Sequence, residues 1–345
     1  MTDNASNGAL APEAKITETT GTIQPAGSWA AAEAALLPRM GGIALRNGLA
    51  LVSEDYWAAA IRMPDGSINV ASGRKPHLPS GKGALGRMGA RGRGRAPFRA
   101  GQGVAGAALQ VGDYQGLPLI RGLARFAETL LVVANVKLKM PQAELPLEGG
   151  RGALALATAF AATETVRAIG PKNAVAQETG AALAAFVPAV LSLKSSTISG
   201  YHGAEHKVIG GREAELRAEA AGLSYDVPAG HASAAASAPK EHDRCGTNLV
   251  GPLLFSTIAA NVLLRGKSGR MSPVAQAAAT AVSLGAALEA LRWATRHGES
   301  AVARMLMSPG RLIQKTLTTS EPTSDQLDVA ERAMKELLRL EAARA

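Results

Sequence analysis

The amino-acid sequence predicts a mainly α-helical protein, in which an Ala-rich helical membrane bundle carries a small N-terminal β-hairpin element. Apolar residues make up 47% of the chain but aromatic residues only 3%, so helices packed closely through small side chains fit better than a core of large ones. Gly246–Leu264 and Met271–Leu288 run for 19 and 18 residues without a charge, close to the ~20 that a bilayer span needs. The clear strand signal is Tyr56–Ala71, where alternating apolar residues flank a Pro64-Asp65-Gly66 turn.

The remaining chain divides by composition. The first residues are polar and of low complexity, which predicts a disordered tail. Arg74 to Arg99 holds eight Lys and Arg and no acid, in a Gly- and Pro-rich stretch typical of a flexible linker. Thr323 and Gln326 form a capping-box pattern before an amphipathic C-terminal helix. We therefore expect a disordered tail (1–38), a small β element (39–72), a basic flexible linker (73–115), a helical membrane region (116–310) with a metal-motif loop (199–247), and a C-terminal tail with a docking helix (311–345).

Three further segments have helical or apolar patterns. Leu117–Lys139 has apolar residues at helical spacing with charges opposite, which favours a helix lying along a surface or interface, with Leu119, Leu123, Phe126, Leu130, Leu131 and Ala134 on its apolar face. Gly152–Thr163 and Thr179–Leu193 are shorter apolar runs that end at charges. Because alanine contributes little to membrane insertion, a soluble bundle of buried Ala-rich helices is the alternative to a membrane bundle.

The expected location is the cytoplasmic (inner) membrane. The N-terminus has no basic start followed by an apolar core, so no signal peptide is expected, and one cysteine, Cys245, excludes a disulfide within the chain. Four crossings would leave the 199–245 connection, with its metal motifs, and the C-terminal tail in the cytoplasm. Arg265, Lys267 and Arg270 between the last two segments conflict with this, since basic residues favour the inside. Those segments would then form a re-entrant hairpin, or a weaker segment would not cross.

The chemistry of the chain centres on two short motifs. On a helix, His202 and His206 lie about 40° apart and Glu205 about 60° to the other side, so two imidazoles could hold one metal ion beside a carboxylate. The spacing matches the inverted zinc-protease pattern H-x-x-E-H. The second motif brings His242 and the single thiol of Cys245 three residues apart. Nitrogen and sulfur ligands favour zinc, so we expect His202, His206, His242 and Cys245 to bind a divalent metal, with Glu205 as the catalytic base.

These motifs resemble the signatures of the YqhQ-like family, bacterial proteins of unknown function (domain of unknown function 1385) that are commonly labelled predicted metal-dependent membrane enzymes. The motifs are Gly200–Lys207 and His242–Thr247, and weaker likeness extends over roughly residues 40 to 340, through Gly41-Gly42, Asn47-Gly48, Leu117–Gly122, and Pro309-Gly310 to Gln326. The resemblance implies a membrane protein with several helices and a metal site, but no established reaction. The chain departs from the family at Asn47, where glutamate is common, at Asp243, where proline is common, and in its Ala-rich helices.

The sequence leaves two functions open. A metal-dependent hydrolase would keep three protein ligands and one open position, whereas a scaffold or partner-binding protein would use all four ligands in a closed structural zinc site. The expected partner is membrane lipid, with Arg74 to Arg99 near anionic headgroups. Nucleic acid is disfavoured because aromatic residues are not interleaved through that stretch. A G-x-G-x-x-G pattern at Gly101–Gly106 follows no strand, so it does not indicate dinucleotide binding.

Overall fold

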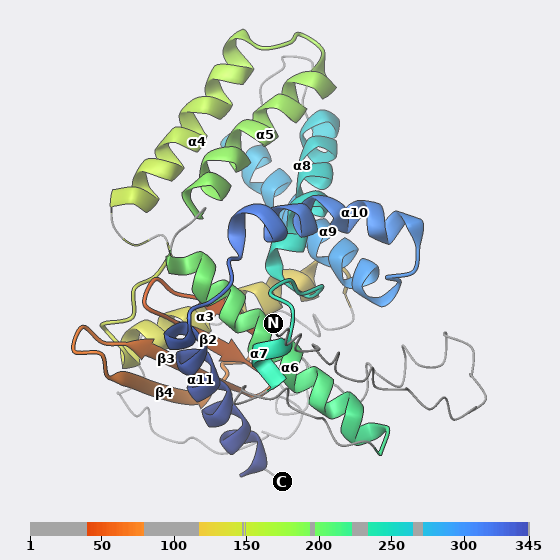
Figure 1. Cartoon of the computed structure of the whole chain (residues 1–345). Coiled ribbons are helices and arrows are strands. Elements are labelled where there is room, and N and C mark those ends of the chain that lie inside the picture. Colours follow the sequence, from red (N-terminus) through yellow and green to blue (C-terminus); the bar gives the residue numbers. More distant parts are fainter. Residues whose placement is uncertain are drawn as a thin grey trace, which may run out of the picture.

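The computed structural model describes residues 40–78, 117–146, 148, 150–193, 197–222, 234–264 and 272–343. The predicted disordered tail, most of the basic linker and the basic link between the last two apolar segments lie outside these residues. Figure 1 shows the described chain as a small sheet flanked by helices, from which further helices extend away. The mainly helical class predicted from the sequence is confirmed.

The N-terminal β element is an antiparallel sheet with strand order β1-β2-β3-β4, larger than the hairpin predicted. The predicted hairpin is its second half, and Gly66, with φ +83°, forms the turn. The first two strands escaped prediction because most of β2 is buried, so its residues show no alternation of apolar and polar character. The strands are β1 (Gly41–Ala44), β2 (Gly48–Val52), β3 (Tyr56–Arg62) and β4 (Ile68–Arg74).

Helices cover both faces of this sheet. On one face, α6 (Thr197–Ala220) and α11 (Ser324–Ala342) share a core with β2 and β3, and the short α7 (Ala234–Ser237) joins them. The predicted capping box of α11 is present, and the helix packs on β2 and β3. The other face packs against α3 (Ile120–Lys139). The sheet is thus the middle layer of three.

The helix α3 buries a different side from its predicted apolar face. The buried positions are Ala124, Glu128, Val132 and Val136, spaced four residues apart. Four residues of the predicted face are instead exposed, namely Phe126, Leu130, Leu131 and Ala134. The acidic Glu128 can be buried because Lys75 and the backbone N–H of Leu78 contact its carboxylate. The outward apolar face is compatible with the surface role expected for this helix, which remains a prediction.

The extended part consists of two helical hairpins that pack through α5 and α8. The first pairs α4 (Gly150–Ile169) with α5 (Ala174–Leu193), and the second pairs α8 (Val250–Leu264) with α9 (Pro273–Arg296). The stretches Gly246–Leu264 and Val274–Arg296 are long and apolar enough to cross a membrane, and only 22% of each apolar window is buried. Large apolar side chains therefore point outward, as with Phe160, Phe255 and Leu263.

The chain between this bundle and α11 runs through α10 (Ala301–Ile313) and then one turn of π-helix, η4 (Gln314–Thr318). Figure 1 shows α10 lying crosswise to α4 and α5, between the bundle and the sheet-containing part. α10 packs against both α8 and α9. This junction is where the two His motifs meet.

Candidate metal centre

The first motif lies on α6, so the predicted metal-motif loop 199–247 is wrong for its first half. Tyr201, Ala204 and Val208 of this helix pack into the core against the sheet. Their burial fixes the rotation of the helix and turns His202 and His206 together toward the second motif. The two imidazole centroids lie 4.4 Å apart, as expected for side chains one turn apart on a helix.

The second motif brings a thiol to these imidazoles. Cys245 is the N-cap of η3 (Gly246–Leu249), and its sulfur accepts the backbone N–H of Thr247 at 3.4 Å. The distance from Cys245 Sγ to His202 Nε2 is 3.1 Å. Within the described part of the chain, one atom each of His202, His206 and Cys245 lies within 4.8 Å of the others, a group that could hold a metal ion.

Backbone carbonyls set the tautomer of both histidines. His202 Nδ1 donates to the carbonyl of Thr318 at 2.9 Å, and His206 Nδ1 donates to that of Lys240 at 2.6 Å. Because a carbonyl can only accept, each Nδ1 carries the proton and each Nε2 keeps its lone pair. His206 Nε2 is buried and has no hydrogen-bond partner among the described residues. An unpaired buried acceptor is costly, and a metal ion would satisfy it.

Burial shifts the pKa of two members of the group, His206 and Cys245. It lowers the pKa of His206 to about 3, so this imidazole is neutral, the form that binds metal. Burial also raises the pKa of the Cys245 thiol, an effect that hydrogen bonds with Thr247 oppose. A cation at the centre would deprotonate the thiol outright. The donor set therefore fits a divalent ion such as zinc.

The π-helical turn η4 and two buried amides support the site. The loop that carries His242 and Cys245 is held by Gln314, whose side-chain oxygen accepts the backbone N–H of His242 at 3.0 Å. Gln314 also donates to Asn248 at 3.1 Å, and Asn248 donates to the carbonyl of Asp243 at 2.7 Å. The same turn presents the Thr318 carbonyl, and π-helical turns occur frequently at functional sites.

His242 lies beside the group but is not part of it. Its ring centroid is 5.8 Å from that of His206. Its Nε2 lies 3.4 Å from a carboxylate oxygen of Glu213, and its Nδ1 accepts the backbone N–H of Arg244 at 3.3 Å. Glu213 is itself buried and paired with the Arg244 guanidinium. The structure thus brings three of the four predicted ligands together and directs the fourth to Glu213.

The predicted base, Glu205, is buried between α6 and the sheet. A Cβ atom on Gly42 of β1 would lie 2.5 Å from the Glu205 side chain, so glycine is needed there for the carboxylate to fit. Burial raises the pKa of Glu205 to about 8, while the nearby charge of His202 lowers it and that of Cys245 raises it. Glu205 therefore interacts electrostatically with His202 and Cys245, but it is not one of the residues whose ligand atoms come together. The neighbouring Lys207 pairs with Glu321 at 2.6 Å.

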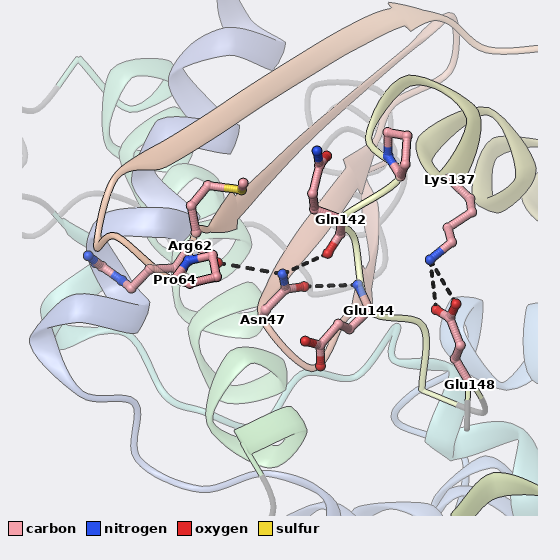
Figure 2. Close-up of a pocket in the computed structure, with 9 residues that line it drawn as sticks. Asn47, Arg62, Pro64, Lys137, Gln142, Glu144 and Glu148 are labelled. Atoms are coloured by element: carbon pink, nitrogen blue, oxygen red, sulfur yellow. Dashed lines mark hydrogen bonds and ion pairs between the residues drawn. The ribbon is translucent and has the colours of Figure 1, made fainter. Parts of the chain in front are cut away.

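A separate pocket of about 590 Å³ is lined in part by Asn47. Figure 2 shows the Asn47 amide linking the β1–β2 turn to the segment after α3, by donating to the carbonyl of Gln142 and accepting the backbone N–H of Glu144, each at 3.0 Å. None of the metal-group residues lines this pocket. Asn47 thus has a structural role that sequence reasoning did not anticipate.

Sequence reasoning also missed the residues that support the metal group. Asn248 lies one residue beyond the second motif, and Gln314 is a lone amide more than 60 residues further on, without a pattern of its own. Thr318 and Lys240 act through backbone carbonyls, which no side-chain motif reveals. Glu213 lies two turns after His206 on α6, in a part of the helix where glutamate and arginine residues are mixed and no single acid stands out.

Comparison with known proteins places the two motifs in a family. The family described as "Protein of unknown function (DUF1385)" matches residues 183–340, a range that includes α6, both motifs, η4 and most of α11. The N-terminal and middle sequence likenesses, and the sheet, lie outside the matched range. No solved structure matches the chain.

A curated relative agrees with this match. "Uncharacterized protein YqhQ" from Bacillus subtilis (strain 168) is 29% identical over 142 residues, which are 41% of this chain and 41% of that protein. The match thus spans less than half of either protein, and the relative has no assigned activity. The resemblance seen in the sequence is confirmed over residues 183–340, which match the DUF1385 family, and the chain is distantly similar to YqhQ.

Proposed function

We propose that this protein is a metal-dependent hydrolase of the cytoplasmic membrane, with zinc held by His202, His206 and Cys245. The convergence of two imidazole Nε2 atoms and a thiol on one point carries the proposal. The buried, unpartnered Nε2 of His206 supports it further, because the Lys240 carbonyl fixes this nitrogen as an acceptor. A set of two nitrogens and one sulfur is typical of zinc.

Each part of the site then has a chemical role. A bound divalent ion supplies a Lewis acid that makes water more acidic and polarises a substrate carbonyl or phosphoryl oxygen. Glu205 lies next to His206 in sequence, and its carboxyl group interacts electrostatically with His202 and Cys245. A cation at the centre would favour the ionised form of this buried carboxyl group, and we propose that the carboxylate then accepts the proton of the attacking water. The carbonyls of Thr318 and Lys240 accept hydrogen bonds from Nδ1 of the two imidazoles and so fix the orientation of the rings.

The number of ligands favours a hydrolase over a closed structural site. Three ligands leave a fourth position for a reactive group, whereas four would fill a tetrahedral zinc. To become the fourth ligand, His242 would have to give up the contact of its Nε2 with Glu213 or that of its Nδ1 with the backbone N–H of Arg244. The scaffold function thus requires one of these contacts to break on metal binding, and the hydrolase function does not.

The membrane location rests on the outward apolar side chains of the bundle. Phe160, Phe255 and Leu263 are 70%, 71% and 82% exposed, which would be unfavourable in water. The sheet, α6 and α11 share one core outside the bundle. This arrangement is compatible with a location of the whole unit on the cytoplasmic side of the membrane. Anionic headgroups remain the proposed partner of the Arg74 to Arg99 stretch.

The substitution Glu205→Gln tests the catalytic proposal, because it keeps the shape of the side chain and removes its basicity. A neutral amide suits the buried position against Gly42, so metal content and melting temperature should stay close to wild type. Complementation of a deletion strain should be lost, since general-base catalysis typically contributes about 10²–10⁴-fold. Full complementation by a metal-loaded Gln variant would remove Glu205 as the base. Loss of metal with loss of complementation would favour the scaffold.

Membrane integration has its own test. Because Gly246–Leu264 and Val274–Arg296 are long and apolar enough to span, the full-length protein should remain in the membrane pellet after washing with alkaline carbonate. A peripheral protein held by charge alone is released by that wash. Quantitative release into the supernatant would contradict the membrane proposal and favour a soluble bundle of Ala-rich helices.

A further inference from the structure

The helix α10 is apolar on two opposite sides. Its inner side buries Ala303, Met307 and Gly310 against neighbouring helices. Its outer side presents Val302, Met305 and Leu312, whose exposed fractions are 52%, 67% and 63%. A helix at the surface of a soluble protein normally turns polar residues outward, so this outer side is unusual for contact with water.

The two edges of the same helix differ in polarity. Arg304 and Arg311 are seven residues apart and share one edge, and Arg311 forms an ion pair with Asp243 of the metal-site loop at 2.9 Å. The opposite edge packs on the start of α8, where a Cβ atom on Gly251 would lie 2.2 Å from the carbonyl of Leu306. One edge of α10 therefore borders the polar site and the other borders the apolar bundle.

An apolar outer side next to an edge with two arginines is typical of a helix that lies in the membrane interface. Such helices insert an apolar face at the boundary of headgroups and acyl chains and place basic residues beside it. Arginine suits that border, because its stem can lie along apolar surface while the guanidinium stays in the headgroup layer. α10 also follows directly on α9, one of the two helices long and apolar enough to span.

We propose that the outer side of α10 docks on the lipid bilayer, with Val302, Met305 and Leu312 among the acyl chains. Arg304 and Arg311 then face the headgroups. Figure 1 supports this placement, because α10 runs crosswise to the bundle at its junction with the sheet-containing part. η4 continues α10, so the Thr318 carbonyl that orients His202 lies next to the headgroup layer. The bilayer is thereby the partner of this surface.

Photocrosslinking in a defined bilayer tests the docking without reference to metal or activity. Full-length protein with p-benzoylphenylalanine in place of Met305 or Leu312 is reconstituted in vesicles of phosphatidylethanolamine and phosphatidylglycerol and irradiated. Intact-protein mass spectrometry should show a phospholipid adduct for each. Lys335, exposed on α11, is the negative control position, and Phe255 in the proposed span is the positive one.

The outcomes separate the proposals. Adducts at Phe255, Met305 and Leu312 but not at Lys335 support the interfacial helix. Adducts at Phe255 without adducts at Met305 and Leu312 overturn it while leaving the spanning helices intact. Adducts at none of the positions overturn it together with the membrane location. Equal adducts at Lys335 also overturn it, because contact with lipid would then be unspecific.

Discussion

Wild-type protein should carry about one zinc ion per chain, and replacing His202 or Cys245 by alanine should leave the purified protein without it. Each side chain supplies one of the three atoms that lie within 4.8 Å of one another. Structural zinc binding is worth about 10–16 kcal/mol, so each ligand contributes roughly 3–5 kcal/mol and its loss lowers affinity more than a hundredfold. Elemental analysis of protein prepared without chelator, from zinc-supplemented medium, measures the ratio directly.

His242→Ala is the matched control for these two variants. In this structure its imidazole contacts Glu213 and Arg244 rather than the group. The variant should therefore keep most of its zinc if three ligands suffice. A loss as complete as that of His202→Ala would instead support four ligands and the closed structural site. A wild type that carries no metal after the same preparation would end the metal proposal altogether.

Gly203→Ala should be among the most destabilising single changes on α6. A Cβ atom at this position would lie 2.1 Å from the backbone oxygen of Ser320, on the segment that leads from η4 to α11. That segment is fixed by the Ser320 backbone N–H, which donates to the carbonyl of Ser199 at 2.9 Å. The segment must move away, at a cost of about 1–3 kcal/mol or more. A lowered melting temperature and weakened zinc retention should appear together, since the adjoining Thr318 carbonyl orients His202.

Gly210→Ala supplies the control on the same helix. Its added methyl would meet only Ala238 Cβ at 3.7 Å, an ordinary contact. Alanine in the interior of a helix is better than glycine by about 0.5–1 kcal/mol, so this variant should be as stable as wild type or slightly more so. If both alanine variants melt alike, the close approach at Gly203 does not constrain the fold.

Much of the local structure was readable from the sequence. The β3–β4 hairpin has alternating residues around a glycine turn, and α11 has a capping box, so each is specified by neighbouring residues. The spacing of His202 and His206 predicted a shared helix face for the same reason. Signals that act within four residues along the chain could therefore be interpreted without the fold.

The parts that could not be predicted depend on distant residues. Which side of α3 is buried depends on the sheet, and burial of Glu128 needs partners from the segment after β4. The direction of His242 is decided by Glu213, on another element. Backbone carbonyls orient His202 and His206, the candidate metal ligands, whatever side chains stand at positions 240 and 318. The spacing of the two motifs predicted four metal ligands, but it contains no information on these contacts.

The three-layer packing of the sheet has a consequence for biosynthesis. The sheet ends at Arg74, yet Val329, Met334 and Leu337 of α11 complete the core over β2 and β3. About 250 residues separate the two, so at roughly 5–20 residues per second the ribosome needs on the order of 10–50 s to supply the missing helix. Until then the part of this sheet face that α11 covers stays open, even after α6 has packed beside it. A prematurely terminated chain can never cover it, and would remain a substrate for quality-control proteases, so only complete chains reach the closed state that orients His202.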